Sequence, residues 1–296
     1  MKEIVIPREL KSDNISQVVS QVITSDLKPS DNQFKFDLTK INFIEPGGVV
    51  ALANLINWLS KNKVNTTFMI TDENPASKNY KCMCYLADCE FFKIFFNENC
   101  FKEPKIRSTM LSMEDLSVDK VLNWSESKLI PFLHRNTQRY CEFSNIRVAV
   151  EEIFNNIMDH SSEHIGCVYG QFYPKTNKIV LSFSDFGIGI PKSMERNFEA
   201  DNDLEYVLLA LEEGKSTKSS PRNRGAGFSN IIRSLTNDNL GTVQIYSNYA
   251  KITIEDKKII HSELSEIFYP GTFFNISIDV NNESLYDEEE EEGFEW

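Results

Sequence analysis

The sequence predicts an α/β protein built from two sheet-and-helix units, and three observations lead to this fold class. Short apolar runs typical of strands alternate with helical patterns along most of the 296 residues. Hydrophobic residues make up 41% and charged residues 25% of the chain, as in soluble globular proteins. The length fits one large domain or two ordinary ones, and the polar stretch NENCFKEPKIRSTM (97–110) offers a boundary.

The first unit is predicted from residues 34–96. FKFDL (34–38) and TTFMIT (66–71) have strand patterns, and VVALANLINWLSKN (49–62) between them has a helical one. This order favours a sheet with helices packed on it. YLADCEFFKIFF (85–96) is expected to be a helix that runs into a strand or its approach.

A helical region is predicted from Ser112 to Ser161. It contains ESKLIPFLHRNTQRYCEF (126–143), in which Pro131 should break or start a helix, and NIRVAVEEIFNNIMDHS (145–161). In the second of these helices we expect Val148, Ile153 and Ile157 to form the buried stripe.

The same helix carries polar residues at positions four apart. Glu152, Asn156 and His160 therefore lie on one helix face. They could form a solvated surface, or a magnesium and water site in which the amide oxygen binds a hard cation and the carboxylate accepts a proton.

The rest of the chain alternates strands, loops and helices. A loop and helix are predicted over 191–213. Strands are predicted over 167–173, 178–184, 241–248, 250–256 and 271–280.

FSDFGIGIP (183–191) follows one of these strands. Asp185, Gly187 and Gly189 could form an ordinary strand-to-loop turn. Alternatively, the glycines let a flat ligand lie against the backbone while Asp185 accepts a hydrogen bond from its edge.

A basic, glycine-containing loop occupies STKSSPRNRGAGFSNIIRSL (216–235). It brings Lys218, Arg222 and Arg224 beside Gly225 and Gly227, ahead of a predicted helix whose positive end faces the loop. The pattern indicates an anion site, with a flexible loop as the alternative, and the chain contains no GxxxxGK[ST] motif.

Together, EEIFNNIMDHS, DFGIGIP and RGAGF resemble the N box and the two glycine boxes of the GHKL ATPase superfamily. The resemblance covers about residues 112–280, including GTFFNISI, and implies a Bergerat-type α/β sandwich that binds ATP and Mg²⁺. It implies that Asp185 receives the adenine amino group beside Gly187 and Gly189, that Asn156 holds magnesium, and that Glu152 is the general base. His160 matches the histidine that commonly ends the N box. A lid would run from Lys192 to Arg224, and the residues near the phosphates would be Thr217, Lys218, Arg224, Gly225, Ala226, Gly227 and Phe228.

Residues 1–100 are similar to the STAS domain of anti-anti-sigma factors. The similarity lies in FDLTKINFIEPGGVVALANLINWLSKN followed by TTFMIT. The loop that usually carries a phosphoacceptor hydroxyl here reads Glu45, Pro46, Gly47, Gly48, with Gly47 at the acceptor position. The resemblance therefore implies a docking or sensing module that is not switched by phosphorylation there.

Four segments follow from these patterns: a STAS-like domain (1–105), a helical linker (106–145), a GHKL domain (146–281) and a disordered acidic tail (282–296). Eight acidic residues between Glu283 and Trp296 account for most of the net charge of −13. Such a run repels itself and is normally disordered. Phe294 and Trp296 in it could dock on a partner, and the alternative is a plain solubilising tail.

The predicted function is nucleotide-driven regulation. An ATPase or anti-sigma-type serine/threonine kinase would use Glu152 to activate water or a partner hydroxyl. The alternatives are a nucleotide-sensing module without turnover and, as a minor one, a histidine kinase with His134, which lies only 18 residues before Glu152. A gyrase-like or MutL-like machine is disfavoured, because after the last predicted strand only the acidic tail remains.

The expected partners are ATP and a regulatory protein, either a STAS-domain protein or a sigma factor, and the kinase resemblance suggests a homodimer. Nucleic acid is a poor partner for this charge. The opening MKEIVIPREL lacks a secretory signal, and VVALANLINWL is too short to span a bilayer, so we expect a cytoplasmic protein. The cluster Cys82, Cys84, Cys89 and Cys100 departs from paired CxxC zinc knuckles and is expected to hold reduced, partly buried thiols.

Overall fold

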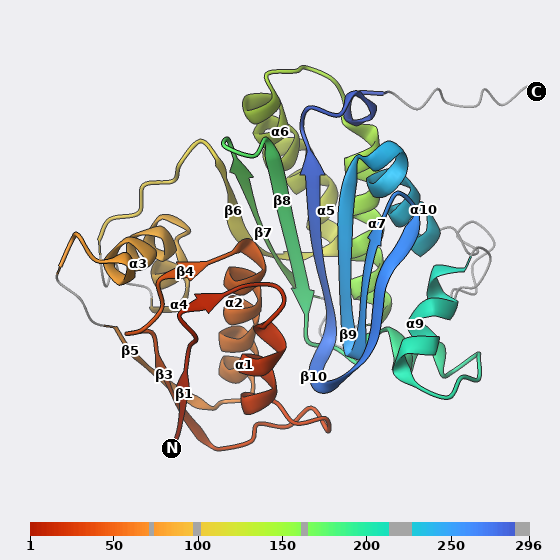
Figure 1. The fold of residues 1–296 in the computed structure, drawn as a ribbon. Coiled ribbons are helices and arrows are strands. Elements are labelled where there is room, and N and C mark those ends of the chain that lie inside the picture. The colour runs from red at the N-terminus through yellow and green to blue at the C-terminus, as the bar shows by residue number, and fades with distance from the viewer. Residues whose placement is uncertain (71–73, 97–101, 161–164, 213–226, 288–296) are drawn as a thin grey trace, which may run out of the picture.

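The computed structural model has two sheet-and-helix units that lie side by side, and the predicted α/β class is confirmed (Figure 1). It describes residues 1–70, 74–96, 102–160, 165–212 and 227–287. The N-terminal unit contains β1 (Lys2–Val5), β2 (Glu9–Leu10), α1 (Ile15–Val22), β3 (Gln33–Asp37), β4 (Phe43–Ile44), α2 (Pro46–Lys61), β5 (Asn65–Met69), α3 (Lys78–Asp88) and α4 (Phe91–Phe96).

The C-terminal unit begins with a strand and a run of helices: β6 (Met110–Ser117), α5 (Val118–Trp124), a π-helical turn (Ser125–Leu129), α6 (Ile130–Thr137) and α7 (Ser144–His160). It continues with β7 (Ile165–Tyr173), β8 (Lys178–Asp185), α8 (Gly189–Met194), α9 (Asp203–Leu211), α10 (Gly227–Thr236), β9 (Gly241–Glu255) and β10 (Lys258–Asp279). Short 3₁₀ turns follow α10 (Asn237–Asn239) and β10 (Glu283–Leu285). Among the described residues, none of the helices is long and apolar enough to cross a membrane.

The N-terminal unit is organised around a parallel sheet in the order β1-β3-β5, with β2 and β4 pairing beside it. The two strands and the helix predicted between residues 34 and 71 are present. The helix starts three residues earlier than expected because Pro46 occupies its first turn, where a missing N–H costs nothing.

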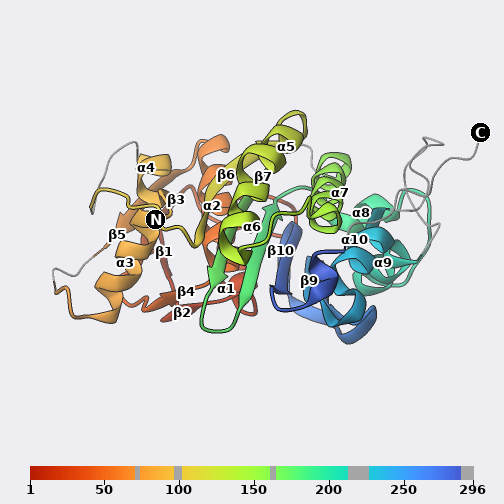
Figure 2. The same cartoon turned by 90° about the horizontal axis from the view of Figure 1, so that it is seen from above.

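The C-terminal unit is built on a five-stranded antiparallel sheet in the order β6-β7-β8-β10-β9. Helices α1 and α2 contact β10, β7 and β8, while α5, α7 and α10 contact β6, β7 and β9. Figure 2 shows these layers from above, with the N-terminal unit on one side and α7 to α10 on the other. The sheet is therefore covered on both faces.

Successive side chains of β8 point to opposite faces of the five-stranded sheet. Leu181 and Phe183 belong to the core shared with α7 and α10. Ser182 and Ser184 point to the other face, where the Asn54 side chain of α2 donates a 3.1 Å hydrogen bond to Ser184 Oγ. On β10, Phe273 packs into the core of the N-terminal unit. The two units thus share one interior instead of meeting at a surface.

Two segments differ in type from the predicted elements. Phe91–Phe96 is helical, although aromatic residues favoured a strand, because the rings of Phe91 and Phe92 are buried against the N-terminal core. Met110–Ser117, predicted as the start of a helical region and linker, is strand β6 and pairs with β7. Its acidic residues give a helical pattern, but pairing at the sheet edge outweighs that local preference.

Helix α7 has nearly the predicted extent, and of its predicted buried stripe Ile153 is confirmed but Val148 is wrong. Ile146, Val150 and Ile153 are buried, whereas Val148 is 36% exposed. Val148 lies two residues from Ile146, or about 200° around the helix, so it cannot share that stripe. The side chain of Ile157 is outside the described residues. Pro131 lies in the first turn of α6, after the π-helical turn, and so starts a helix as expected.

The residues predicted to begin the acidic tail are partly folded. Leu285 is buried, and the Tyr286 hydroxyl donates a 2.6 Å hydrogen bond to the Val280 carbonyl. Arg139 lies 4.7 Å over the Tyr286 ring. Packed structure therefore continues to Tyr286, and residues 288–296 of the predicted tail lie outside the described residues.

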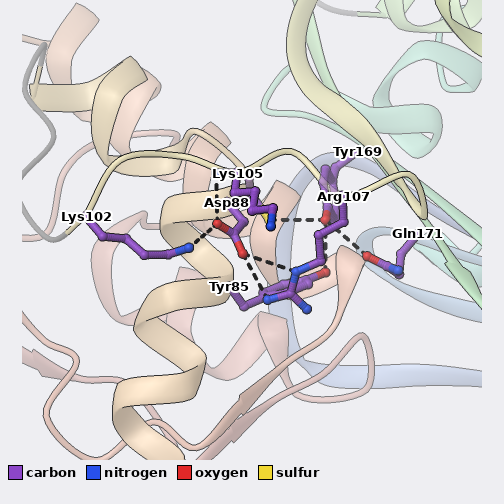
Figure 3. A network of polar contacts seen from close by, with 8 residues as sticks. Tyr85, Asp88, Lys102, Lys105, Arg107, Tyr169 and Gln171 are labelled. Atoms are coloured by element: carbon purple, nitrogen blue, oxygen red, sulfur yellow. Dashed lines mark hydrogen bonds and ion pairs between the residues drawn. The ribbon is translucent and has the colours of Figure 1, made fainter. Parts of the chain in front are cut away.

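Asp88, at the end of α3, ties the connection between the units to the fold. Figure 3 shows Lys102 and Arg107 reaching its carboxylate from two sides. The Arg107 Nη2 atom lies 2.9 Å from Oδ2, and the Lys105 backbone N–H donates a 3.0 Å bond to Oδ1. Burial alone raises the pKa of Asp88, but the hydrogen bonds from Lys102, Lys105 and Arg107 outweigh it and leave the pKa below its ordinary value.

We expect the change Asp88→Asn to lower the free energy of unfolding by about 2 kcal/mol at pH 7, because two cations lose a buried anionic partner. A lowered pKa means that this stability is present above the ordinary aspartate pKa and is lost as the pH falls below about 4. Urea denaturation at pH 7 and pH 3.5 measures both effects. The change Asp26→Asn, at an exposed carboxylate, is the control; equal losses for the two variants at pH 7 would contradict the role of Asp88.

Candidate functional site

Asp185 is the fully buried carboxyl group at the end of β8. Its Oδ1 atom accepts a 2.7 Å hydrogen bond from the Gly187 N–H, two residues on in the loop. Its Oδ2 atom accepts a 3.1 Å bond from the Thr272 N–H on β10. The carboxylate is therefore held between its own loop and a strand 87 residues away in sequence.

A β-bulge in β10 brings Thr272 to this position. The pairing of β10 with β9 shifts register between Leu264 and Tyr269 and again between Tyr269 and Thr272. Gly271, inside the bulge, has a φ of +67°. A Cβ atom there would lie 2.6 Å from Asp185 Oδ1 and 2.6 Å from the Gly187 nitrogen. Only glycine permits both this backbone conformation and this close approach.

Strand β9 holds the glycine loop from the other side. Gly189 has a φ of +80°, and a Cβ atom there would lie 2.8 Å from both Asn248 Oδ1 and Ser247 Oγ. Ser247 Oγ accepts a 2.9 Å bond from the Ile190 N–H and donates a 2.8 Å bond to the Gly271 carbonyl. Asn248 Nδ2 donates to the Ile188 carbonyl at 3.1 Å. The glycine predicted at 189 is therefore required by backbone conformation and by packing.

Burial raises the pKa of Asp185 to about 7, and the hydrogen bonds from Gly187 and Thr272 act in the opposite direction. Near neutral pH the group is thus poised between its neutral and ionised forms. Two carboxylate oxygens offer about four acceptor positions, of which backbone N–H groups use two. Asp185 can therefore accept a further bond from a ligand amino group, but, since it is fully buried, neighbouring atoms must move to admit the ligand.

Aromatic contacts fasten the two motif helices to the strands of this site. Phe154 of α7 packs edge-on against Phe183 of β8, with ring centres 5.7 Å apart. Phe228 of α10 stacks on Phe274 of β10 at 5.9 Å. Phe183 lies two residues before Asp185 and is paired with Phe274 across the sheet. The fold therefore places α7, the Asp185 loop and α10 together, since α7 also contacts α8 and α10.

The predicted catalytic and metal-binding residues lie on α7. Glu152 is half-buried, two residues before the Phe154 anchor. Asn156 and His160 belong to the same continuous helix, in register with Glu152, but their side chains are outside the described residues. Among the residues that are described, no group of three or more His, Cys, Asp or Glu side chains could hold a metal ion.

The second glycine loop is placed only in part. Gly227 begins α10, as predicted. Phe228, expected near the phosphates, has its ring in the core, so only its backbone remains for a ligand. Five predicted residues lie outside the described ranges: Thr217, Lys218, Arg224, Gly225 and Ala226.

The predicted lid, from Lys192 to Arg224, is described only in its first part, to Glu212. Its first half contains α9, whose Val207 and Ala210 are buried against the sheet. Helix α9 is therefore part of the packed fold, and residues 213–224 of the predicted lid lie outside the described residues.

The structure also describes the surroundings of His134 and the state of the predicted cysteine cluster. His134 Nε2 lies 2.8 Å from the Cys141 carbonyl, with its ring 5.6 Å from that of Phe143. Cys82, Cys84 and Cys89 carry free thiols, as expected, and Cys100 lies outside the described residues.

Four further residues complete the site, although no motif in the sequence points to them: Ser247, Asn248, Gly271 and Thr272. Their signals are weak: a Ser-Asn pair ending a predicted strand, and a Gly-Thr pair opening the last one. Such pairs occur in many turns. Only strand pairing shows that both meet the Asp185 loop.

No protein-family model, no curated protein and no solved structure matches this chain. Its function must therefore be argued from its own residues.

We expect the change Gly271→Ala to disrupt the site. A methyl group would collide with Asp185 and Gly187 and would impose a strained positive φ, at a cost on the order of 3 kcal/mol in the free energy of unfolding. Thermal denaturation measures this loss. Gly166→Ala, at a strand glycine of β7, is the comparison; an equal or smaller loss for Gly271→Ala would contradict the close approach.

Asp185 should make stability depend on pH. Because its pKa is raised on folding, its contribution is fully present below about pH 4 and is lost as the pH rises through about 7. The unfolding free energy of the wild type minus that of Asp185→Asn should therefore fall by about 2–4 kcal/mol from pH 4 to pH 8. Urea denaturation across this range measures the difference. Parallel curves for the two proteins would show that Asp185 titrates normally.

Proposed function

We propose that the chain binds ATP with Mg²⁺ in a GHKL-type domain and uses it in regulation, by hydrolysis or by transfer of the γ-phosphate to a partner serine or threonine. The observation that carries this proposal is the buried Asp185 carboxylate, held by backbone N–H groups beside two motif helices. A buried acid in a glycine-rich strand-to-loop turn suits recognition of a purine amino group.

The residues around Asp185 suit the proposed binding of the adenine base. Asp185 retains free acceptor positions, and Gly187 and Gly189 remove side chains from the loop beside it. Asn156 would hold Mg²⁺ through its amide oxygen, which is a donor type that suits this hard cation. The resemblance of the second glycine box would place six residues near the phosphates: Thr217, Lys218, Arg224, Gly225, Ala226 and Gly227.

Glu152 is the proposed general base. It would accept the proton of an attacking water or hydroxyl group as that oxygen forms its bond to the γ-phosphorus, and ADP would leave. Its position on α7, close to the Phe154 anchor, ties it to the strand that carries Asp185. A single rigid sheet would thus position both ends of the nucleotide.

The N-terminal unit is proposed to be STAS-like, with a parallel sheet crossed by α2. In this proposal Gly47 would take the position of the phosphoacceptor, and a Cβ atom there would collide with Ser12 Oγ and would lie 2.8 Å from Phe273 on β10. This end of α2 is therefore packed against the five-stranded sheet. A serine at this position does not fit, so the phosphate acceptor would be water or another protein, such as a separate STAS-domain protein or a sigma factor.

A nucleotide sensor without turnover is the second candidate, favoured by contacts on the two sides of Asp185. Ser184, the residue before it, accepts a bond from Asn54 of α2 and bonds Tyr269 at 2.7 Å. Phe186, the residue after it, packs on Tyr269 within the N-terminal core. A shift of the loop on ligand binding would therefore reach α2 directly.

Calorimetry and a transfer assay test the proposal. We expect Mg-ATP to bind the purified chain with measurable heat, and Asp185→Asn to remove that heat while the circular dichroism spectrum is kept. With γ-labelled ATP and cell lysate, label should appear as free phosphate or on a second protein, and Glu152→Gln should reduce this by at least a hundredfold with ATP still bound.

Glu151→Gln is the matched control, because Glu151 precedes Glu152 on α7 and lies 4.0 Å from Arg147. This variant should keep turnover. ATP binding without any labelled product would favour the sensor, and absence of binding heat that depends on Asp185 would refute both candidates.

A further inference from the structure

An apolar groove lies between α9, α10 and the hairpin that joins β9 to β10. It has a volume of about 500 Å³. Its walls include Leu208 and Leu211 of α9, Ile232 of α10, and Ile254 and Ile259 of the hairpin. Ile259 is 44% exposed. Apolar surface open to water in this way is typical of a docking site.

Two cations, Arg233 and Lys257, also line this groove, together with the Glu212 carboxylate. Arg233 lies in the last turn of α10, and Lys257 lies in the hairpin turn. Both are exposed, and neither forms an ion pair with a carboxylate in the described part of the chain. The neighbouring Lys258, in contrast, pairs with Asp256 at 3.0 Å. The groove therefore combines apolar surface with two exposed cations.

The segment after β10 begins close to the hairpin turn that carries Lys257. Asn282 Nδ2 donates a 2.8 Å bond to the Asp238 carbonyl, in the turn that follows α10. Lys257 donates its backbone N–H to Thr236 Oγ1, at the start of the same turn, at 3.1 Å. Residues 236–238 thus contact both the hairpin turn and the segment that leads to Asp287.

The residues after Asp287 include both acidic and aromatic side chains. Glu288 to Glu292 come first, followed by Gly293, Phe294, Glu295 and Trp296. Nine extended residues reach about 30 Å, whereas the ten residues of α10 span about 15 Å. The segment is therefore long enough for its acidic residues to reach Arg233 and Lys257 and for its two aromatic rings to reach the apolar walls.

We propose that residues 288–296, the acidic segment, bind in this groove of the same chain. The glutamates pair with Arg233 and Lys257, and Phe294 and Trp296 fill the space between α9, α10 and the hairpin. The proposal does not depend on nucleotide binding.

The fluorescence of Trp296 can report whether this side chain is bound in the groove. The chain has three tryptophans, and the other two, Trp58 and Trp124, are 7% and 2% exposed. The fluorescence of the full chain minus that of Trp296→Phe isolates Trp296. We expect acrylamide to quench this signal at least threefold less than it quenches N-acetyltryptophanamide. The double change Arg233→Glu and Lys257→Glu should remove this protection from quenching. Salt at 0.5 M should reduce it, because it screens the ion pairs.

Lys258→Glu is the matched control, since it reverses a neighbouring cation that points to Asp256, and it should leave the protection within twofold. Ile259→Ser provides a second groove variant at an exposed position and should reduce the protection. Quenching of Trp296 equal to that of the free compound would overturn the proposal. So would protection that the groove variants do not change, or protection that appears only as protein concentration rises, which would indicate a second copy as the partner.

Discussion

Burial of the five-stranded sheet on both faces is the constraint on which the rest of the structure depends. Helix α2 lies between this sheet and the parallel sheet of its own unit, and most of its circumference is buried. A helix that is apolar all round is stable only in an interior. The two units therefore cannot separate without exposing α2 on one side and residues such as Phe273 on the other.

The same constraint builds the candidate site. Because β8 and β10 are central strands buried on both sides, the end of β8 is also buried, and a carboxyl group there needs hydrogen-bond donors. The bulge in β10 supplies the Thr272 N–H, and the glycine loop supplies that of Gly187. The resulting group is held in place by both elements, and its burial raises its pKa.

The shared interior also gives the N-terminal unit a direct connection to Asp185. Asn54, Ser184 and Tyr269 form a buried chain of hydrogen bonds that runs from α2 to the residue before the carboxylate. Buried polar chains of this kind hold groups in defined positions, because any displacement leaves a donor or acceptor without a partner. If the site binds a nucleotide, as we propose, the N-terminal unit would be sensitive to it without being its substrate.

Segments with strong and consistent local patterns could be predicted from the sequence. The α2 and α7 helices, the strands β3 and β8, and the start of α10 follow from apolar spacing and from turn residues. Segments with conflicting local signals could not. Met110–Ser117 has a helical composition but pairs at a sheet edge, and Phe91–Phe96 has strand-like residues but is helical, because tertiary contacts there exceed weak local preferences.

By itself, the sequence determined the α/β class, the acidic residue that ends β8, and the glycines that follow it, since these depend on spacing of two to four residues. Only the tertiary structure decided what surrounds Asp185. Ser247, Gly271 and Thr272 come from strands some 60 to 90 residues further along the chain, and a register shift in β10 sets their positions. Such contacts arise from strand pairing, which a local pattern does not encode.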